Sequence, residues 1–236
     1  MTLRKGQAAA ARPPTASEPA APPSLIETMR MEPGGLLPLL PGHLERLQDS
    51  SAALGYACPS EQEIRQRITQ ATAGLDAGCW WRLRLLLSAN GDLNLETAPL
   101  EPPKPPLQVV VQGPRMSGAQ DWLLHKTTHR PWYEGAAQWL AEHPGVFDVL
   151  YWNDAGEMCE GSRSNLYMQN AQGRWLTPNL ESGALPGVQR QALLRAGLVS
   201  EARITREDFL QAKAIRISNA LRGWCDGVII APCRQG

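Results

Sequence analysis

Lys126 lies in a short segment that is rich in positive charge, Leu123-Leu124-His125-Lys126-Thr127-Thr128-His129-Arg130. A lysine that does covalent chemistry must lose its proton near neutral pH, and both burial and neighbouring cations lower its pKa. Arg130 and the two histidines supply the charge, and the leucine pair supplies apolar surface. The segment therefore suits a nucleophilic amine, although an ordinary solvated lysine is the commoner case.

An acidic turn and a helix start come further along the chain. Glu160 lies at the end of an expected strand, directly before Gly161-Ser162. A buried carboxylate beside a pyridine ring would keep the ring nitrogen protonated, so that the ring can accept electrons. Leu185-Pro186-Gly187 opens a helix in which the N–H groups of Val188 and Gln189 are free to hold a phosphate. The alternatives are a surface glutamate and an ordinary helix start with a preceding proline.

Two further sets of polar side chains could bind an anion. Ser218 and Asn219 end a buried-looking strand, where polar groups often face ligands, but an Asx-type turn is the alternative interpretation. Arg46 lies between the apolar positions of the first expected helix and could reach a phosphate with two hydrogen bonds. It could equally be a solvated arginine paired with Glu45 or Asp49.

The sequence indicates neither a metal site nor a disulfide framework. His125 and His129 have the i, i+4 spacing of a helical metal pair, but no third ligand accompanies them. The cysteines are odd in number and form no Cys-x-x-Cys pair, namely Cys58, Cys79, Cys159, Cys225 and Cys233. A reducing, cytoplasmic setting is the simplest interpretation.

Length and charge limit the class of protein. The 236 residues suffice for one large domain or two small ones, and 23 basic residues balance 23 acidic ones. This balance gives no reason to expect a nucleic-acid partner, and no apolar stretch approaches transmembrane length. Residues 1–23 are rich in alanine and proline without an apolar signal segment, so we expect a disordered leader. An organelle transit peptide fits less well, because Glu18 and the prolines interrupt a basic amphipathic helix.

Hydrophobic periodicity and turn residues predict the elements before residue 100. The expected strands are Leu25–Met31, its hairpin partner Leu36–Leu40, Cys79–Ala89 and Leu93–Thr97. One helix has apolar positions from Leu44 and ends at Gly55. A second begins with a Ser60/Glu63 capping box and runs to about Leu75.

A proline-rich segment over residues 100–106 predicts a stiff linker between two domains. The expected domains are a small N-terminal α/β domain over residues 24–99 and a larger, strand-rich domain over residues 107–236. The expected strands of the larger domain are Leu107–Gln112, Val146–Trp152, Glu157–Glu160, Asn165–Gln169, Arg174–Thr177, Leu198–Ile204, Ala214–Ser218 and Gly227–Ile230. Its expected helices are Trp132–Glu142, Val188–Ala196 and Arg206–Gln211. The fold class is α+β.

The order of these motifs from Leu25 to Ile230 closely resembles the fold-type IV family of pyridoxal-phosphate enzymes, the class IV aminotransferases. The nearest resemblance within the family is to the aminodeoxychorismate lyases. The blocks that carry it are Ile26-Glu27-Thr28-Met29-Arg30, His43-Leu44-Glu45-Arg46-Leu47-Gln48-Asp49, Lys126 to Arg130, Glu160 to Tyr167, Leu185 to Arg190 and Ile217 to Trp224. The resemblance implies a two-domain fold with a pseudo-barrel second domain and a cofactor in the cleft between the domains.

The resemblance also implies a role for each motif. Lys126 would form the Schiff base with pyridoxal phosphate, and Glu160 would bind the pyridine nitrogen. The cofactor phosphate would be held by Arg46, by the backbone of Val188 and Gln189, and by the side chains of Ser218 and Asn219. Arginines should bind the substrate carboxylates, with Arg30, Arg84 and Arg222 as candidates.

Two departures from the family pattern bear on the reaction. Aminotransferases of the family often carry a tyrosine five residues after the lysine, but here that position is Pro131, and Tyr133 is the candidate substitute. Leu221-Arg222-Gly223-Trp224 replaces the glycine-rich substrate loop of the branched-chain enzymes. Both departures disfavour branched-chain transamination.

The resemblance therefore implies a lyase that converts 4-amino-4-deoxychorismate to 4-aminobenzoate and pyruvate in folate biosynthesis. The alternatives are a transaminase for D- or branched-chain amino acids and a non-catalytic relative of the fold. A cytoplasmic homodimer is expected, with an aminodeoxychorismate synthase as a further partner.

Overall fold

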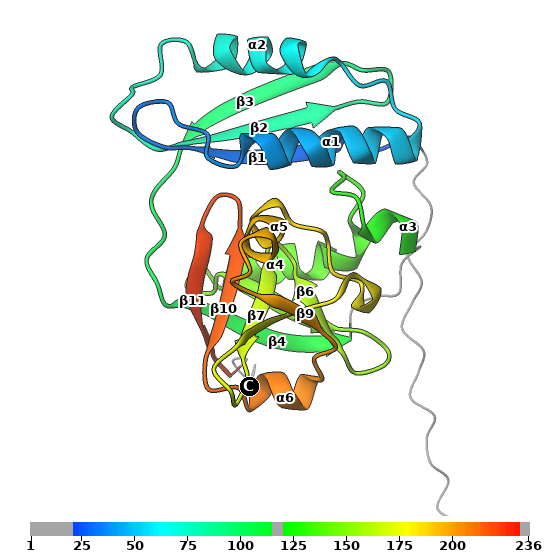
Figure 1. The fold of residues 1–236 in the computed structure, drawn as a ribbon, viewed down its shortest axis with the longest axis vertical. Helices are drawn as coiled ribbons and strands as arrows, with labels where there is room; N and C mark the ends of the chain where they lie inside the picture. The colour runs from blue at the N-terminus through cyan, green and yellow to red at the C-terminus, as the bar shows by residue number, and fades with distance from the viewer. Residues whose placement is uncertain (1–20, 115–119, 232–236) are drawn as a thin grey trace, which may run out of the picture.

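A computed structural model describes residues 21–114 and 120–231. Nearly all of the predicted leader, and Cys233, lie outside the described residues. The chain forms two sheets that stack one above the other, joined by the extended segment 100–106 (Figure 1). No helix among the described residues has the length and apolar character needed to cross a membrane.

The smaller sheet consists of β1 (Leu25–Met31), β2 (Trp81–Leu87) and β3 (Leu93–Pro99), in that order and antiparallel throughout. Buried residues alternate along β1 and β2, as expected for strands that cover a core on one face only. Helices α1 (Leu40–Leu54) and α2 (Glu61–Thr72) pack on that face through Leu44, Leu47, Ile64 and Ile68. The opposite face of β1 carries Thr28, which lines the cavity described below.

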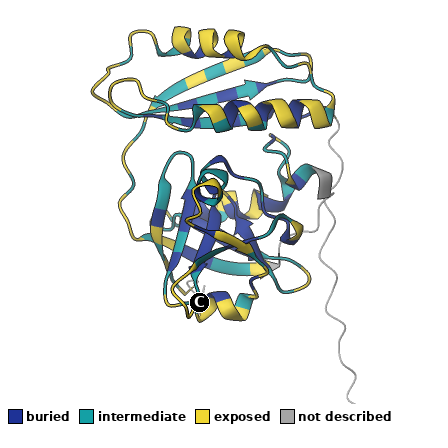
Figure 2. Ribbon diagram, in the orientation of Figure 1, coloured by how far each residue is buried: buried dark blue, intermediate teal, exposed yellow. Residues whose placement is uncertain are grey.

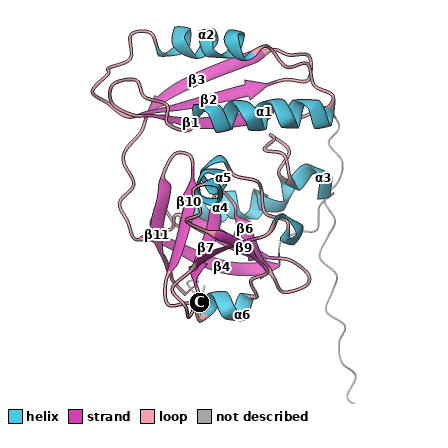
Figure 3. Cartoon of the chain, viewed as in Figure 1, coloured by secondary structure: helices cyan, strands magenta, loops and turns pink. Residues whose placement is uncertain are grey.

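The larger sheet has eight strands in the order β6-β5-β4-β11-β10-β7-β8-β9. Their bounds are β4 Leu107–Pro114, β5 Asp148–Trp152, β6 Met158–Gly161, β7 Asn165–Gln169, β8 Trp175–Pro178, β9 Ser200–Ala202, β10 Ile215–Asn219 and β11 Gly223–Ile229. The edge strand β6 curls back beside β7, so that Met158 and Leu166 share one core with Phe209. Together the eight strands form a curled sheet, or half-barrel (Figure 3).

Helices surround the larger sheet. They are α3 (Gln120–Leu123), α4 (Glu134–Glu142), α5 (Val188–Arg195) and α6 (Arg206–Leu210), with 3-10 turns at Pro131–Tyr133 and Leu180–Ser182. Trp132, Tyr133 and Leu140 pack against Val149 and Tyr151, which fixes the start of α4 on the sheet. Buried residues gather in the central strands, such as β5 and β7, whereas β3, β9 and the outer faces of α1 and α2 are partly or fully exposed (Figure 2).

The α+β fold predicted from the sequence is confirmed, including the Ser60/Glu63 capping box and the left-handed Gly55 at the end of α1. The division into two domains at residues 100–106 stays a prediction, which limited proteolysis within that segment would test.

Two local predictions are wrong. Leu36–Leu40 is not a strand: a single bridge joins Glu32 to Leu36, and Leu40 already begins α1. Pro38 and Pro41 lack the N–H donors of a strand, and a proline suits the first turn of a helix. Strand β11 begins at Gly223, four residues before the predicted start.

Candidate active site

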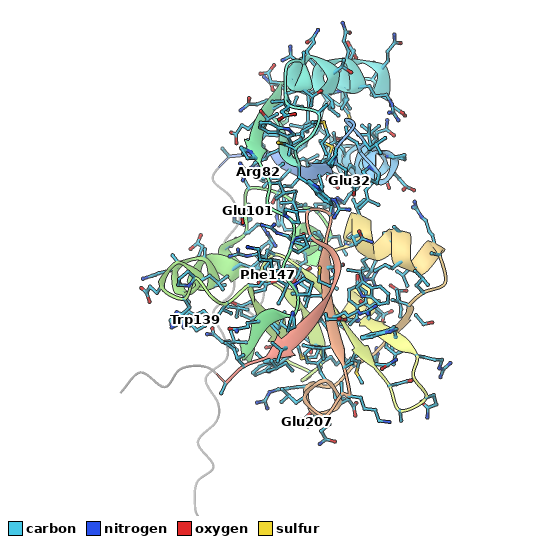
Figure 4. The ribbon with its side chains drawn as sticks, turned by 90° about the vertical axis from the view of Figure 1, so that its left-hand side faces the viewer. Glu32, Arg82, Glu101, Trp139, Phe147 and Glu207 are labelled. Carbon is cyan, nitrogen blue, oxygen red and sulfur yellow. The ribbon has the colours of Figure 1, made fainter. Side chains whose placement is uncertain are left out.

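A cavity of about 250 Å³ lies where the two sheets face each other. The smaller sheet and α1 contribute Thr28 and Arg46, and the remaining lining comes from the larger part of the chain. Phe147, which also lines the cavity, lies below Glu101 of the connecting segment and Arg82 of the smaller sheet (Figure 4). Among the predicted site residues, the lining contains Arg46, Lys126, Glu160, Val188, Gln189, Ser218, Asn219 and Arg222.

Lys126 is positioned by backbone pairing with β1. The amide of Ile26 donates to the Lys126 carbonyl at 2.7 Å, and Leu25 and Thr127 form an antiparallel bridge. The Lys126 side chain is half-buried, and its Nζ donates to Thr28 Oγ1 at 3.2 Å. The lysine therefore reaches the cavity from a fixed edge of the smaller sheet.

The environment of Lys126 favours the neutral amine. Burial lowers its pKa from 10.5 to about 7, and the cations Arg46, Arg130 and Arg84 act in the same direction, whereas Glu27 opposes them. The sequence indicated Arg130 and the neighbouring histidines as the source of charge; the structure adds Arg46 and Arg84, which are distant in the sequence. At neutral pH a large fraction of the amine is unprotonated and able to act as a nucleophile or base.

Glu160 ends β6 and is buried, with 4% of its surface exposed. Its Oε1 accepts a hydrogen bond from the Tyr133 hydroxyl at 2.6 Å, and its Oε2 accepts one from the Leu185 amide at 3.0 Å. These donors favour the ionised carboxylate and fix its plane. Tyr133, proposed from the sequence as a substitute near the ring hydroxyl, contacts Glu160.

The turn after Glu160 is held by a buried carboxylate. Asp148, fully buried at the start of β5, accepts hydrogen bonds from Ser162 Oγ at 2.6 Å, Ser164 Oγ at 2.5 Å and the Arg163 amide at 3.2 Å. A Cβ at Gly161 would overlap the Asp148 carboxylate, so only glycine fits there. Asp148 was missed from the sequence because the two serine hydroxyls that it holds are 14 and 16 residues away.

Helix α5 begins at the cavity with free backbone donors. Gly187 is its N-cap and supplies no side-chain cap, so the N–H groups of Val188 and Gln189 have no partner within the helix. Both residues line the cavity, and the helix dipole adds partial positive charge there. Asn165 fixes the approach to the helix, since its Nδ2 donates to the Leu185 carbonyl at 2.9 Å.

Gly187→Ala is expected to weaken this anion site. An added Cβ would overlap Asn165 Oδ1, which is buried and held by Leu185, so Asn165 or the helix start must move. We expect a loss of about 1–3 kcal/mol in the free energy of unfolding, together with weaker cofactor binding. Urea unfolding with and without cofactor measures both. Gly135→Ala in α4, where nothing lies within 4 Å of the added Cβ, is the matched control. Equal behaviour of the two variants would contradict this prediction.

Ser218 and Asn219 line the cavity but have defined roles in the protein itself. Ser218 Oγ lies 2.7 Å from the Tyr167 hydroxyl. Asn219 Oδ1 accepts from the amides of Leu221 and Arg222 at 3.1 and 2.9 Å, and its Nδ2 donates to a carbonyl. The Asn219 side chain thus forms the Asx-type turn that the sequence left open.

The predicted substrate arginines are not gathered at one place. Arg222 lines the cavity, although its Nη1 donates to the Glu101 carbonyl at 2.5 Å. Arg30 lines a separate small cavity and pairs with Glu32 at 2.7 Å. Arg84 is outside the lining. It lies opposite Thr28 in the register of β1 and β2, and its charge lowers the pKa of Lys126.

Two arginines that sequence reasoning did not assign to substrate binding also line the cavity, Arg130 and Arg163. Arg130 stacks over the Tyr133 ring at 4.7 Å, which keeps it beside the Glu160 end. Arg130 belongs to the lysine segment and Arg163 to the turn after Glu160. The motifs therefore contained both arginines but did not show that they line the cavity.

The arrangement can bind a flat anion that carries a ring nitrogen. Lys126 offers an amine with a lowered pKa, Glu160 a buried carboxyl group held by two donors, and α5 free N–H groups, with Arg46 beside them. The donor set therefore fits pyridoxal phosphate, which needs an amine, an acid at the ring nitrogen and a phosphate site.

Comparisons with known proteins place the chain in one family. A family model described as amino-transferase class IV matches residues 24–228. A candidate aminodeoxychorismate lyase of Schizosaccharomyces pombe is 29% identical over 213 residues, which cover 88% of this chain and 90% of that protein. The crystal structure of a candidate amino-acid aminotransferase from Mesorhizobium loti is 34% identical, with a TM-score of 0.80 over 88% of this chain and 99% of the other. The crystal structure of a candidate 4-amino-4-deoxychorismate lyase from Legionella pneumophila is 21% identical, with a TM-score of 0.72 over 92% of this chain and 91% of the other.

Proposed function

Because the chain belongs to the class IV aminotransferase family and is a fold-type IV, pyridoxal-phosphate-dependent enzyme, we propose that it converts 4-amino-4-deoxychorismate to 4-aminobenzoate and pyruvate. The reaction is an elimination that needs no second substrate, and the aromatic product makes it strongly favourable.

One observation about the cavity carries the proposal. Its lining contains the side chains of Arg46, Arg130, Arg163 and Arg222, against a single carboxylate, Glu160, among the described residues. Pyridoxal phosphate brings a phosphate, and aminodeoxychorismate brings two carboxylates. A site with this excess of cations suits a doubly charged acid better than a simple amino acid with one carboxylate.

In the proposed mechanism Lys126 first holds the cofactor and then acts as a base. When bound, the cofactor supplies an electron sink that is conjugated with the amine of the substrate. Once the amine of the substrate has replaced it on the cofactor, the freed Lys126 amine would take the proton from the amine-bearing ring carbon. The carbon–oxygen bond to the enolpyruvyl group would then break, and the departing enolpyruvate would gain this proton to become pyruvate. Glu160 keeps the ring nitrogen protonated throughout, since Tyr133 and Leu185 stabilise its charge.

A second candidate function is transamination, because the Mesorhizobium loti relative at 34% identity is a candidate amino-acid aminotransferase. The two reactions share the roles of Lys126 and Glu160 and differ in the step after proton removal. A transaminase requires a keto acid as amino acceptor, whereas the lyase does not.

The assay that separates them measures pyruvate and 4-aminobenzoate from aminodeoxychorismate without any added keto acid. We expect both products in equal amounts. Turnover that requires a keto acid would replace the lyase with the transaminase. A protein that binds no cofactor under reconstitution would contradict both.

The proposal extends to the setting of the enzyme. We infer a cytoplasmic homodimer that receives its substrate from an aminodeoxychorismate synthase. Light scattering of the purified protein tests the dimer, and co-purification tests the synthase partner.

A further inference from the structure

Three polar side chains form a buried cluster between β1 and α1. Glu27 on β1 is 3% exposed and His43 on α1 is 2% exposed. Arg46 Nε donates to Glu27 Oε1 at 2.8 Å, and Arg46 Nη2 donates to Glu27 Oε2 at 2.5 Å. His43 Nδ1 lies 2.5 Å from Glu27 Oε2. Both carboxylate oxygens are therefore used, and the guanidinium of Arg46 is held in one plane.

The charges of the cluster are defined by its contacts. Burial alone would raise the pKa of Glu27, but Arg46 and His43 lower it to about 2, so the carboxylate is ionised. Burial lowers the pKa of His43, which is therefore the neutral imidazole near pH 7. Because an ionised carboxylate only accepts, Nδ1 of the neutral ring carries the proton and donates to Glu27.

Arg46 has space on two sides of its guanidinium. It lines the candidate active site and also a neighbouring cavity of about 510 Å³. Both bonds to Glu27 use the Nε and Nη2 edge, which leaves Nη1 for an anion. An arginine between two cavities has alternative rotamers available, so a fixed partner is needed to keep it at the start of α5.

The contact of α1 with α5 fixes the position of the Arg46 guanidinium. Gly42, one turn before Arg46, lies so close to α5 that a Cβ there would approach Val188 Cγ1 to 2.8 Å. One residue before Arg46, Glu45 pairs with Arg195 at 2.6 Å. These contacts hold α1 against α5, so that Arg46 lines the same cavity as Val188 and Gln189.

We propose that Glu27, supported by His43, is a positioning residue that holds Arg46 at the phosphate end of the cofactor site. The inference deepens the proposed function and rests on its cofactor site, not on the lyase reaction. The alternative is that Glu27 only neutralises a buried arginine. The two differ in sign: a counter-charge weakens anion binding, so its removal would strengthen binding, whereas loss of a positioning residue weakens it.

The test compares pyridoxal phosphate with pyridoxal, which lacks the phosphate, as ligands of the apoprotein. Glu27→Gln removes one of the two acceptors of Arg46, and we expect the affinity for pyridoxal phosphate to fall about 10- to 100-fold. The affinity for pyridoxal should change less than about 3-fold, since Lys126 is intact. Absorbance titration measures both. Glu61→Gln in α2, in an exposed ion pair with Arg65, is the matched control and should change neither.

Combined variants separate this role from general damage. Arg46→Lys alone should weaken pyridoxal phosphate binding, and Glu27→Gln added to Arg46→Lys should cost nothing more, because Glu27 acts through Arg46. If Glu27→Gln does not fold, His43→Asn and His43→Leu take its place. Asparagine keeps an N–H donor near the position of Nδ1 and should preserve the affinity, whereas leucine should lower it.

Each outcome decides the question. Unchanged or tighter binding of pyridoxal phosphate by Glu27→Gln, or an equal loss for both ligands, would overturn the positioning role. Equal affinities of the two His43 variants for pyridoxal phosphate would show that His43 takes no part in positioning Arg46. If wild-type apoprotein does not bind pyridoxal phosphate, the proposed cofactor site itself fails, which is a separate result.

Discussion

Lys126→Met is expected to abolish turnover and to prevent borohydride from fixing the cofactor to the chain. Methionine keeps the length of the side chain but has no amine to bond the cofactor or to move the substrate proton. A loss of about 10³-fold or more in kcat is the usual consequence of removing a group with both roles. Pyruvate release measures the first effect, and peptide mapping after reduction measures the second. Lys213→Met, at an exposed position outside the cavity lining, should change neither.

The same variant should stabilise the apoprotein in a pH-dependent way. The groups that act on Lys126 are Arg46, Arg130, Arg84, Glu27 and His43. Burial and the three arginines lower its pKa from 10.5 to about 7, although Glu27 opposes them. At and below pH 7 the protonated lysine is therefore less favourable in the folded chain than in the unfolded chain. Between about 7 and 10.5 the unfolded chain keeps the proton that the folded chain has lost. Wild-type stability therefore rises relative to the variant over this range.

Urea unfolding of both apoproteins at pH 7, 8, 9 and 10 tests the sign. We expect the variant to be more stable by a few kcal/mol at pH 7 and the difference to shrink at each step. Titrations of other groups cancel in the comparison. A difference that stays constant or grows with pH would mean that the folded protein does not lower the pKa of Lys126.

The sequence predicts the elements well where local patterns determine them. Alternation of apolar residues gives β1 and β2, and the Ser60/Glu63 box gives the start of α2. The site motifs are also local: an acid before a Gly-Ser turn and a Pro-Gly helix start can be recognised in a few residues. Lys126, Glu160 and Val188 accordingly line one cavity, as the resemblance implied.

Contacts between distant residues could not be predicted in this way. Arg46 had acids nearby in its own helix, yet its partner is Glu27, 19 residues earlier on another element. Tyr133 and Glu160 are 27 residues apart. Such pairs depend on the register of strands and the packing of helices, which local spacing does not determine. Arg30 likewise donates to the carbonyl of Leu221, which lies 191 residues later in the chain.

The hairpin error has a physical explanation of the same kind. Leu36 to Leu40 is apolar enough for a strand, and two glycines precede it in a turn. Leu37 and Leu40 instead pack against the core of the smaller sheet from the loop and the first turn of α1. Leu36, by contrast, is 60% exposed, so the apolar run neither forms a strand nor is buried along its whole length.

Glu160→Gln is expected to lower kcat by about 10²- to 10³-fold while the cofactor stays attached to Lys126. A neutral amide cannot stabilise a proton on the ring nitrogen, so the ring accepts electrons poorly. The variant should still fold. Its amide oxygen can face the Leu185 N–H, and its NH₂ can face the Tyr133 hydroxyl, which can turn to accept.

Tyr133→Phe provides the graded comparison for Glu160. It removes one hydrogen bond to Oε1 but leaves the carboxylate and the Leu185 contact, so we expect a smaller fall in kcat, of about 3- to 30-fold. The double variant separates two explanations. If Tyr133 acts by stabilising the charge of Glu160, Tyr133→Phe should have little further effect once Glu160→Gln is present. Independent, multiplied losses would instead give Tyr133 a role of its own in the cavity, and unchanged turnover in Glu160→Gln would exclude the ring-nitrogen role of the acid. Because both side chains would act on the cofactor ring and not on the substrate, kcat should respond more than the KM for the substrate in every one of these variants.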